Sequence, residues 1–164
     1  MNTKSNSLEP AVAENYYHAP IAEVWRALTD PEWIVQWWGD PRLYHMTRVK
    51  HELRPGGSVF YGGKFVGGVQ DGREFSATGV TRIVDAPTLL EYTRLYDDGI
   101  PIAEETLIRY ELDERNGVTR VCVAHSGFQD EQAREIHADG WRRVLGYLEN
   151  HFQKMKQSTQ TKNR

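Results

Sequence analysis

The 164-residue sequence contains only one cysteine and no long apolar run. The single cysteine, Cys122, excludes an internal disulfide and any metal site built from several cysteines. No apolar run approaches the roughly 18 residues that suggest a membrane span. The opening residues, MNTKSNSLEP, also lack the apolar core of a signal peptide. These absences predict a cytoplasmic protein that has no membrane partner.

The sequence also lacks an excess of basic residues and the common catalytic motifs. It has 20 Lys and Arg residues and 23 Asp and Glu residues, and the two signs of charge are interspersed along the chain. Nucleic acid is therefore not an expected partner. GxSxG, Walker A, a strand followed by GxGxxG, and HExxH are all absent. His137 and Trp141 lie four residues apart, but no second metal-binding side chain has matching spacing. The sequence predicts no cofactor and no metal site.

The composition is typical of a single globular domain. Hydrophobic residues make up 39% of the chain, charged residues 26% and aromatic residues 11%. No internal repeat or long Gly/Ser/Pro linker divides the sequence. We expect one domain over residues 9–155, with flexible tails at 1–8 and 156–164.

Residues 130–155, DEQAREIHADGWRRVLGYLENHFQKM, show the strongest periodicity in the sequence. Apolar side chains recur every three or four residues between charged ones, which is typical of an amphipathic helix with one buried face. Asp130 is the expected N-cap, and the periodicity is lost from Lys156 onward. Gly140, beside Trp141, costs about 1 kcal/mol relative to alanine inside a helix. We expect another element to pack against the backbone there; alternatively, the glycine keeps a cavity open beside the indole.

Two short helices are predicted near the start of the chain. The run at 11–18 has strand character, and Pro20 suits the opening of a helix that ends near Asp30. Asp30 then caps a second helix with Pro31 in its first position, and this helix stops at Gly39.

Between these helices and the long helix, the pattern alternates as in β-strands. We expect strands near 48–54, 58–66, 75–84, 89–96, 104–112 and 118–128. Tight turns join most of them into antiparallel hairpins, among them Asp97-Asp98-Gly99 and Asn116-Gly117. The order predicts an α+β fold in which a curved antiparallel sheet is covered on its concave face by the long helix.

Four strings in this order resemble a known superfamily: HAPIAEVWRALTDPEWIVQWWGDP, ELRPGGSVFYGGKF, TRVCVAHSGF and GWRRVLGYLENHF. Over about residues 11 to 153 the chain closely resembles the START-like, or SRPBCC, superfamily. Within it, the chain resembles the family named for homology to the activator of the Hsp90 ATPase, to which the calicheamicin-resistance type of protein is also related. The resemblance implies a helix-grip (Bet v 1-like) fold, with the sheet wrapped around the C-terminal helix. It also implies a deep, largely apolar cavity that different members use for lipids, polyketides, hormones or other small molecules.

Strand parity predicts which polar side chains face this cavity. In LLEYTRLY, Tyr92 and Arg94 share a face with Leu90, and in RVCVAH, His125 shares a face with Val121. Since the apolar side chains should face the helix, the three polar ones should face it too. The full set of candidate ligand-binding residues is Trp37, Trp38, His51, Tyr92, Arg94, His125 and Trp141.

Most of these residues also have a purely structural interpretation. The tryptophans are most simply core residues, although they could line a pocket for a flat ligand. His51 and His125 are more often hydrogen-bonded wall residues than catalysts. His125 is nevertheless the one candidate for acid–base catalysis, because histidine titrates near neutral pH.

Arg94 is the most informative of the candidates. A buried arginine needs a carboxylate or an anionic ligand. We expect an internal ion pair, with an anionic ligand as the alternative; the carboxylates available as partners are Glu52, Glu91, Glu104, Glu105 and Glu111.

Three functions remain open at this stage. The favoured one is binding of a small hydrophobic or amphipathic ligand between the sheet and the helix. The second is an enzyme of the cyclase, dehydratase or hydrolase type that acts on such a ligand. The third is an interaction module for an Hsp90-type chaperone, as the family name suggests. A homodimer is also left open.

Overall fold

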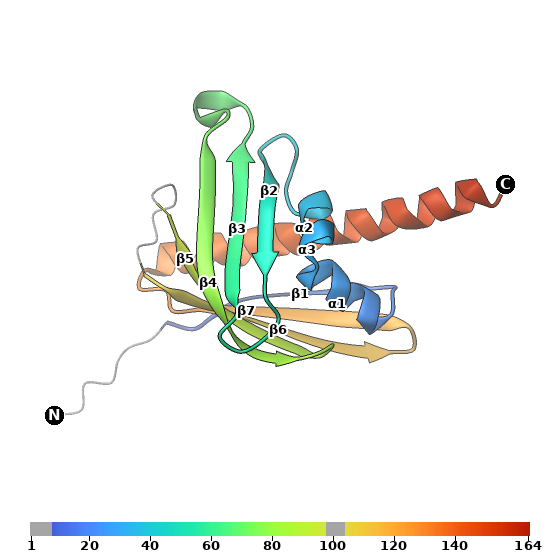
Figure 1. Ribbon diagram of the computed structural model, residues 1–164, viewed down its shortest axis with the longest axis horizontal. Helices are drawn as coiled ribbons and strands as arrows, with labels where there is room; N and C mark the ends of the chain where they lie inside the picture. Colours follow the sequence, from blue (N-terminus) through green and yellow to red (C-terminus); the bar gives the residue numbers. More distant parts are fainter. Residues whose placement is uncertain (1–7, 98–103) are drawn as a thin grey trace.

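The computed structural model describes residues 8–97 and 104–164, and it contains one curved antiparallel sheet and a long helix (Figure 1). The sheet has the strand order β1-β7-β6-β5-β4-β3-β2. The strands are β1 Ala11–Tyr17, β2 Tyr44–His51, β3 Ser58–Phe65, β4 Glu74–Asp85, β5 Leu89–Tyr96, β6 Thr106–Arg115 and β7 Val118–Ser126. The helices are α1 Ile21–Thr29, α2 Pro31–Trp37, the short 3-10 turn η1 Gly68–Gln70, and α3 Glu131–Lys162. The predicted α+β order is confirmed.

Local sequence signals place the short helices and one hairpin where they were expected. The Asp30 side chain accepts a hydrogen bond from the Glu32 amide at the start of α2. Asn116 and Gly117 both have positive φ, 53° and 76°, as a tight turn between β6 and β7 requires. The turn expected at Asp97-Asp98-Gly99 lies largely outside the described residues. Strand β2 begins at Tyr44, earlier than the alternation near 48–54 indicates.

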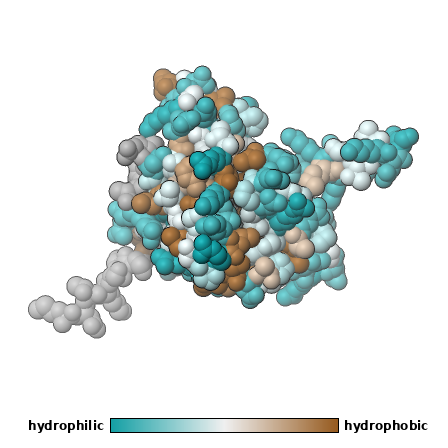
Figure 2. Space-filling model, viewed as in Figure 1, coloured by the Kyte–Doolittle hydropathy of each residue, from teal (hydrophilic) through white to brown (hydrophobic). Residues whose placement is uncertain are grey.

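Helix α3 crosses the concave side of the sheet and continues beyond it (Figure 1). Its Asp130 cap is confirmed, since the side chain accepts from the Gln132 amide. The predicted end at Met155 is wrong, because the helix continues to Lys162. The last turns carry polar, exposed residues, so they have no buried face that a periodic pattern could reveal (Figure 2). The domain limits at 9 and 155 stay a prediction.

The buried faces of the strands follow the predicted parity. Leu90, Tyr92, Val121 and His125 have no exposed surface, and Arg94 is 7% exposed. Leu90, Tyr92 and Val121 belong to a hydrophobic core that includes the α3 residues Trp141, Leu145, Leu148 and Phe152. The concave face of the sheet is therefore the one that α3 covers. In the described ranges, no helix is apolar and long enough to cross a lipid bilayer.

Candidate functional site

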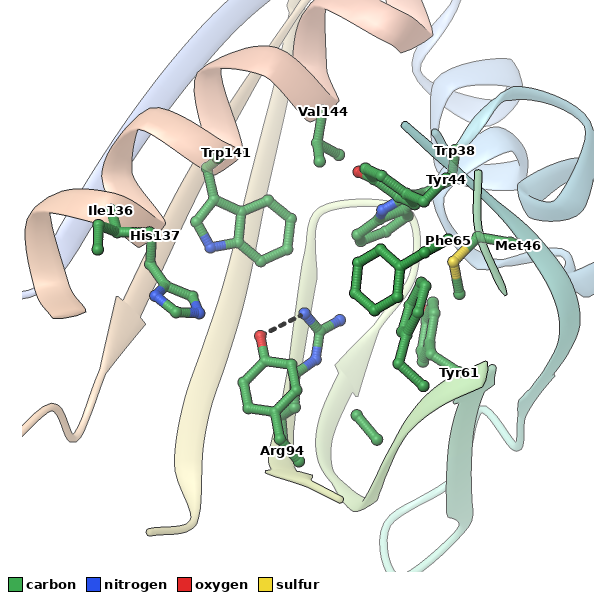
Figure 3. Close-up of a pocket in the computed structure, with 14 residues that line it drawn as sticks. Trp38, Tyr44, Met46, Tyr61, Phe65, Arg94, Ile136, His137, Trp141 and Val144 are labelled. Atoms are coloured by element: carbon green, nitrogen blue, oxygen red, sulfur yellow. Dashed lines mark hydrogen bonds between the residues drawn. The ribbon is translucent and has the colours of Figure 1, made fainter. Parts of the chain in front are cut away.

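A cavity of about 260 Å³ lies between α3 and the β2–β5 part of the sheet (Figure 3). Its volume is just below the usual range for small-molecule pockets, which begins at about 300 Å³. Most of its wall is aromatic or aliphatic. The lining residues are Trp38, Tyr44, Met46, Tyr61, Phe65, Phe75, Ala77, Arg94, Tyr96, Ile136, His137, Gly140, Trp141 and Val144. The cavity is thus largely apolar, and Arg94 is the permanently charged side chain among its lining residues.

Gly140 opens the α3 side of this cavity. An added Cβ at Gly140 would meet no atom within 4 Å, so no element packs against the backbone there. The expected close contact is therefore wrong, and the alternative, a glycine that leaves space beside the indole of Trp141, matches the structure. Helix α3 presents Ile136, Gly140 and Val144 at four-residue spacing along the same cavity wall.

Gly140→Ala should raise the free energy of unfolding by about 0.5 to 1 kcal/mol, because alanine favours the helix and meets no obstacle. Gly146→Ala is the matched control for the effect of alanine inside the helix, since Gly146 is also unobstructed in α3 but does not line the cavity. Gly140→Leu should keep the stability gain while its side chain fills the chamber and weakens ligand binding. Chemical denaturation checks this prediction, and a loss of stability in Gly140→Ala would contradict it.

The Arg94 guanidinium is surrounded by aromatic rings. Its two terminal nitrogens donate hydrogen bonds to the hydroxyls of Tyr92 at 3.1 Å and Tyr96 at 3.4 Å. Its Nε is buried, and no described residue accepts a hydrogen bond from it. Five ring centroids lie between 5.2 and 5.8 Å from its central carbon, within cation–π range: Trp38, Tyr61, Tyr92, Tyr96 and Trp141.

The internal ion pair expected for Arg94 is not formed with any carboxylate of the described residues. Glu91 and Glu111 instead pair with Arg109, at 3.2 and 2.8 Å. Since side chains alternate along a strand, Glu91 lies on the opposite face of β5 from Arg94. Glu52 accepts from the amide and hydroxyl of Ser58. Arg94 is therefore a buried cation that contacts hydroxyls and aromatic rings, and no carboxylate in residues 8–97 or 104–164 neutralises its charge.

His125 lies behind the cavity wall, and both of its ring nitrogens are engaged. The indole N–H of Trp141 can only donate, so Nδ1 of His125 accepts at 3.1 Å. Nε2 then carries the proton and lies 2.7 Å from the Thr106 hydroxyl, which in turn donates to the Arg94 carbonyl. Burial, with a smaller contribution from Arg94, lowers the pKa of His125 to about 2. The ring is a neutral link between α3 and the sheet, with no nitrogen left for acid–base chemistry.

Three further candidates face the helix side but do not line the cavity. His51 and Tyr92 lie in an aromatic layer beneath it, where their ring centroids are 4.8 Å apart. Trp37 stacks on Trp38 and donates its indole N–H to the Ala27 carbonyl. Of the seven candidates, the structure brings Trp38, Arg94 and Trp141 together at the cavity and places Trp37, His51, Tyr92 and His125 behind it.

Acid should destabilise the fold from about pH 6.5 downward. Burial lowers the pKa of His51 to about 4, well below its usual 6.5, and that of His125 still further. Both rings stay neutral when folded but take up a proton when unfolded, so their stabilisation is present above pH 6.5 and is lost as the pH falls. Each contributes a slope of up to about 1.4 kcal/mol per pH unit. Denaturation between pH 7.5 and 5 should show this slope, reduced in His51→Phe; an unchanged slope in that variant would contradict the assignment.

Several cavity residues were not among the sequence candidates. Tyr44, Met46, Tyr61, Phe65 and Phe75 come from β2, β3 and β4, where the alternation is interrupted by a bulge in β2 and by paired glycines in β3. The Phe75 ring occupies the space that a side chain at Gly63 would take. His137 was considered only as a metal ligand and set aside. Its position on the same helix face as Gly140 and Trp141 is the signal that could have identified it.

Comparison with known proteins places this architecture in a known group. The model of the family "Activator of Hsp90 ATPase homolog 1-like protein" matches residues 18–153. Among proteins with curated descriptions, none matches the chain in sequence.

Solved structures share the fold over most of the chain. The AHSA1 protein of Silicibacter pomeroyi superposes with a TM-score of 0.74 at 19% identity, covering 88% of this chain and 97% of that one. CalU16 from Micromonospora echinospora gives 0.58 at 25% identity, covering 84% and 71%. DynU16, a protein in the dynemicin biosynthetic locus, gives 0.69 at 18% identity, covering 89% of this chain and 48% of that one. The helix-grip fold is thereby confirmed.

Proposed function

Because the chain belongs to the family of activator of Hsp90 ATPase homolog 1-like proteins, we propose that it binds a small amphipathic molecule in the cavity and holds an anionic group at Arg94. Proteins with this fold commonly bind hydrophobic ligands. The observation that carries the proposal is the buried Arg94 guanidinium, which lies on the cavity wall without a carboxylate partner among the described residues.

Electrostatics supports an anion over a neutral ligand. An unpaired charge is costly to bury, and aromatic rings offset only part of this cost. A carboxylate or enolate that enters the cavity would receive charge-assisted hydrogen bonds from the spare guanidinium N–H groups, in a chamber of low dielectric constant. The aromatic wall would hold the apolar part of the same molecule.

Native mass spectrometry of freshly purified protein gives the first test. We expect a fraction of the protein to carry an added mass that denaturation releases, and the released compound should contain an ionisable acid.

A matched probe pair gives the second test. By isothermal titration calorimetry, 2-naphthoate should bind at least about tenfold more tightly than the neutral 2-naphthamide. Equal binding of the two probes, or no binding of either, would contradict the proposal.

The other functions stay predictions. Catalytic turnover of the bound molecule would show as chemical change of the retained compound, and action on a chaperone requires no retained compound at all. The comparison with DynU16 supports a biosynthetic small molecule as the ligand class, since that protein's locus is named for dynemicin biosynthesis. A homodimer and a cytoplasmic location are likewise predictions.

A further inference from the structure

His137 is the second polar group of the cavity that could contact a ligand. Its ring extends from α3 toward the chamber, beside Trp141 (Figure 3). Nδ1 lies 2.8 Å from the Ala133 carbonyl, which can only accept, so Nδ1 carries the ring proton. Nε2 therefore presents a lone pair, and it has no hydrogen-bond partner among the described residues. Rings of Phe128, His125 and Tyr96 at 4.9, 5.4 and 5.8 Å hold the imidazole in place.

The groups around His137 keep its imidazole neutral. Burial lowers its pKa, the hydrogen bond to Ala133 opposes this, and the positive charge of Arg94 lowers it further. The His125 ring, which also lies against the imidazole, is held neutral by its own burial, which lowers its pKa. At neutral pH, Nε2 is thus a hydrogen-bond acceptor.

Most other polar atoms of the cavity wall already have partners within the protein. The Tyr61 hydroxyl lies 3.1 Å from His51, the Tyr96 hydroxyl accepts from Arg94, and the Trp141 N–H donates to His125. Beside the Trp38 N–H and the Tyr44 hydroxyl, which lie together in the wall, the spare donors of Arg94 and the acceptor of His137 are the points at which a ligand can be oriented.

We infer that His137 Nε2 accepts a hydrogen bond from a hydroxyl of the ligand, so that the site takes a hydroxylated aromatic acid. This inference rests on the proposed function, because Arg94 must hold the acid. The ring system follows from the aromatic side chains that surround the chamber: Trp38, Tyr44, Tyr61, Phe65, Phe75 and Trp141. A cation at one point and a hydrogen-bond acceptor at another would bind molecules that carry both an acid and a hydroxyl more tightly than molecules that carry only the acid.

Calorimetry with naphthoates can test the inference. The probes are 2-naphthoate and its 5-, 6-, 7- and 8-hydroxy derivatives, measured with wild-type protein at pH 7.5. We expect the best hydroxy isomer to bind about 3- to 12-fold more tightly than the parent, the equivalent of one net hydrogen bond. In His137→Phe, the ratio of the two affinities should fall to about one, whatever change the new ring causes in the affinity for the parent. His137→Gln, which restores an acceptor oxygen, should recover part of the isomer's advantage.

His151→Phe is the matched control, because His151 lies on the same helix but does not line the cavity. It should leave the preference intact. The inference is wrong if no isomer exceeds the parent, or if the preference survives in His137→Phe. Failure of 2-naphthoate itself to bind wild-type protein would instead overturn the proposed function, and this inference with it. The two failures are therefore distinguishable.

Discussion

Trp141→Ala is expected to lower the free energy of unfolding by about 3 to 5 kcal/mol. The indole is 3% exposed, and its ring packs edge-on against Trp38 and Tyr110, with centroids 5.6 and 5.9 Å apart. Alanine would leave a void in the centre of the helix–sheet contact. It would also remove the donor to Nδ1 of the fully buried His125. Urea denaturation, with midpoint and slope fitted separately, measures the loss.

Trp141→Phe separates the two contributions. Phenylalanine keeps most of the ring contact but cannot donate to His125, so the loss should be about 1 to 3 kcal/mol, the cost of an unsatisfied buried acceptor. A loss below about 1 kcal/mol in Trp141→Ala would show that the indole serves as a cavity wall that the protein can replace with solvent.

The sequence was sufficient to predict the fold because local and long-range signals agreed. Asp30 and Asp130 cap the helices that follow them, and Asn116-Gly117 forms the turn that its residues favour. The alternation in β5 and β7 identified the concave face correctly. The end of α3 was missed because its last turns are polar and exposed, so no pattern of burial marks them.

The candidate site was harder to predict, because parity identifies a face and not a position on that face. Tyr92, His125 and Arg94 all point toward α3, but only Arg94 reaches the cavity. The curvature of the sheet and the path of α3 across it decide which side chain reaches the cavity. Strand alternation predicts neither of them. Residues from β2 and β3 were missed for a different reason, because the bulge between Met46 and Arg48 shifts the register of β2 against β3.

The lack of a carboxylate partner for Arg94 among the described residues could have been predicted in part from the sequence. Glu91 is adjacent to Tyr92, so alternation places it on the far face of β5, where it meets Arg109. Glu111 is a residue of β6 and lies opposite Leu89 of β5 in the sheet. Its carboxylate forms an ion pair with the same arginine. Alternation also places Glu52 and Glu105 on the face away from Arg94, but it leaves Glu104 on the same face as Thr106 and Ile108. In the structure Glu104 is exposed and precedes β6, so only the structure removes the last of these carboxylates as a partner.

Arg94→Met should weaken the binding of an anionic ligand without lowering the stability of the ligand-free protein. The affinity for 2-naphthoate should fall by about 30-fold or more, which corresponds to the loss of one partner of a desolvated charge pair. The affinity for 2-naphthamide should change little, because its binding does not depend on the charge. Without ligand, the free energy of unfolding should stay the same or rise, since methionine removes a buried, uncompensated cation from an apolar site. Calorimetry and denaturation of the same preparation measure both effects.

Arg109→Met is the control for this experiment, because it removes the same charge from the opposite face of the sheet, where Arg109 already pairs with Glu91 and Glu111. Its side chain is 37% exposed, so the affinity for both naphthalene probes should stay near the wild-type value. If Arg94→Met instead unfolded the protein while the affinity of the remaining folded fraction stayed unchanged, the guanidinium would serve only to pack the rings around it. Anion binding would then have to be assigned elsewhere. A cation that serves to bind a ligand predicts weaker binding of 2-naphthoate with no loss of stability in Arg94→Met, and no change in affinity in Arg109→Met.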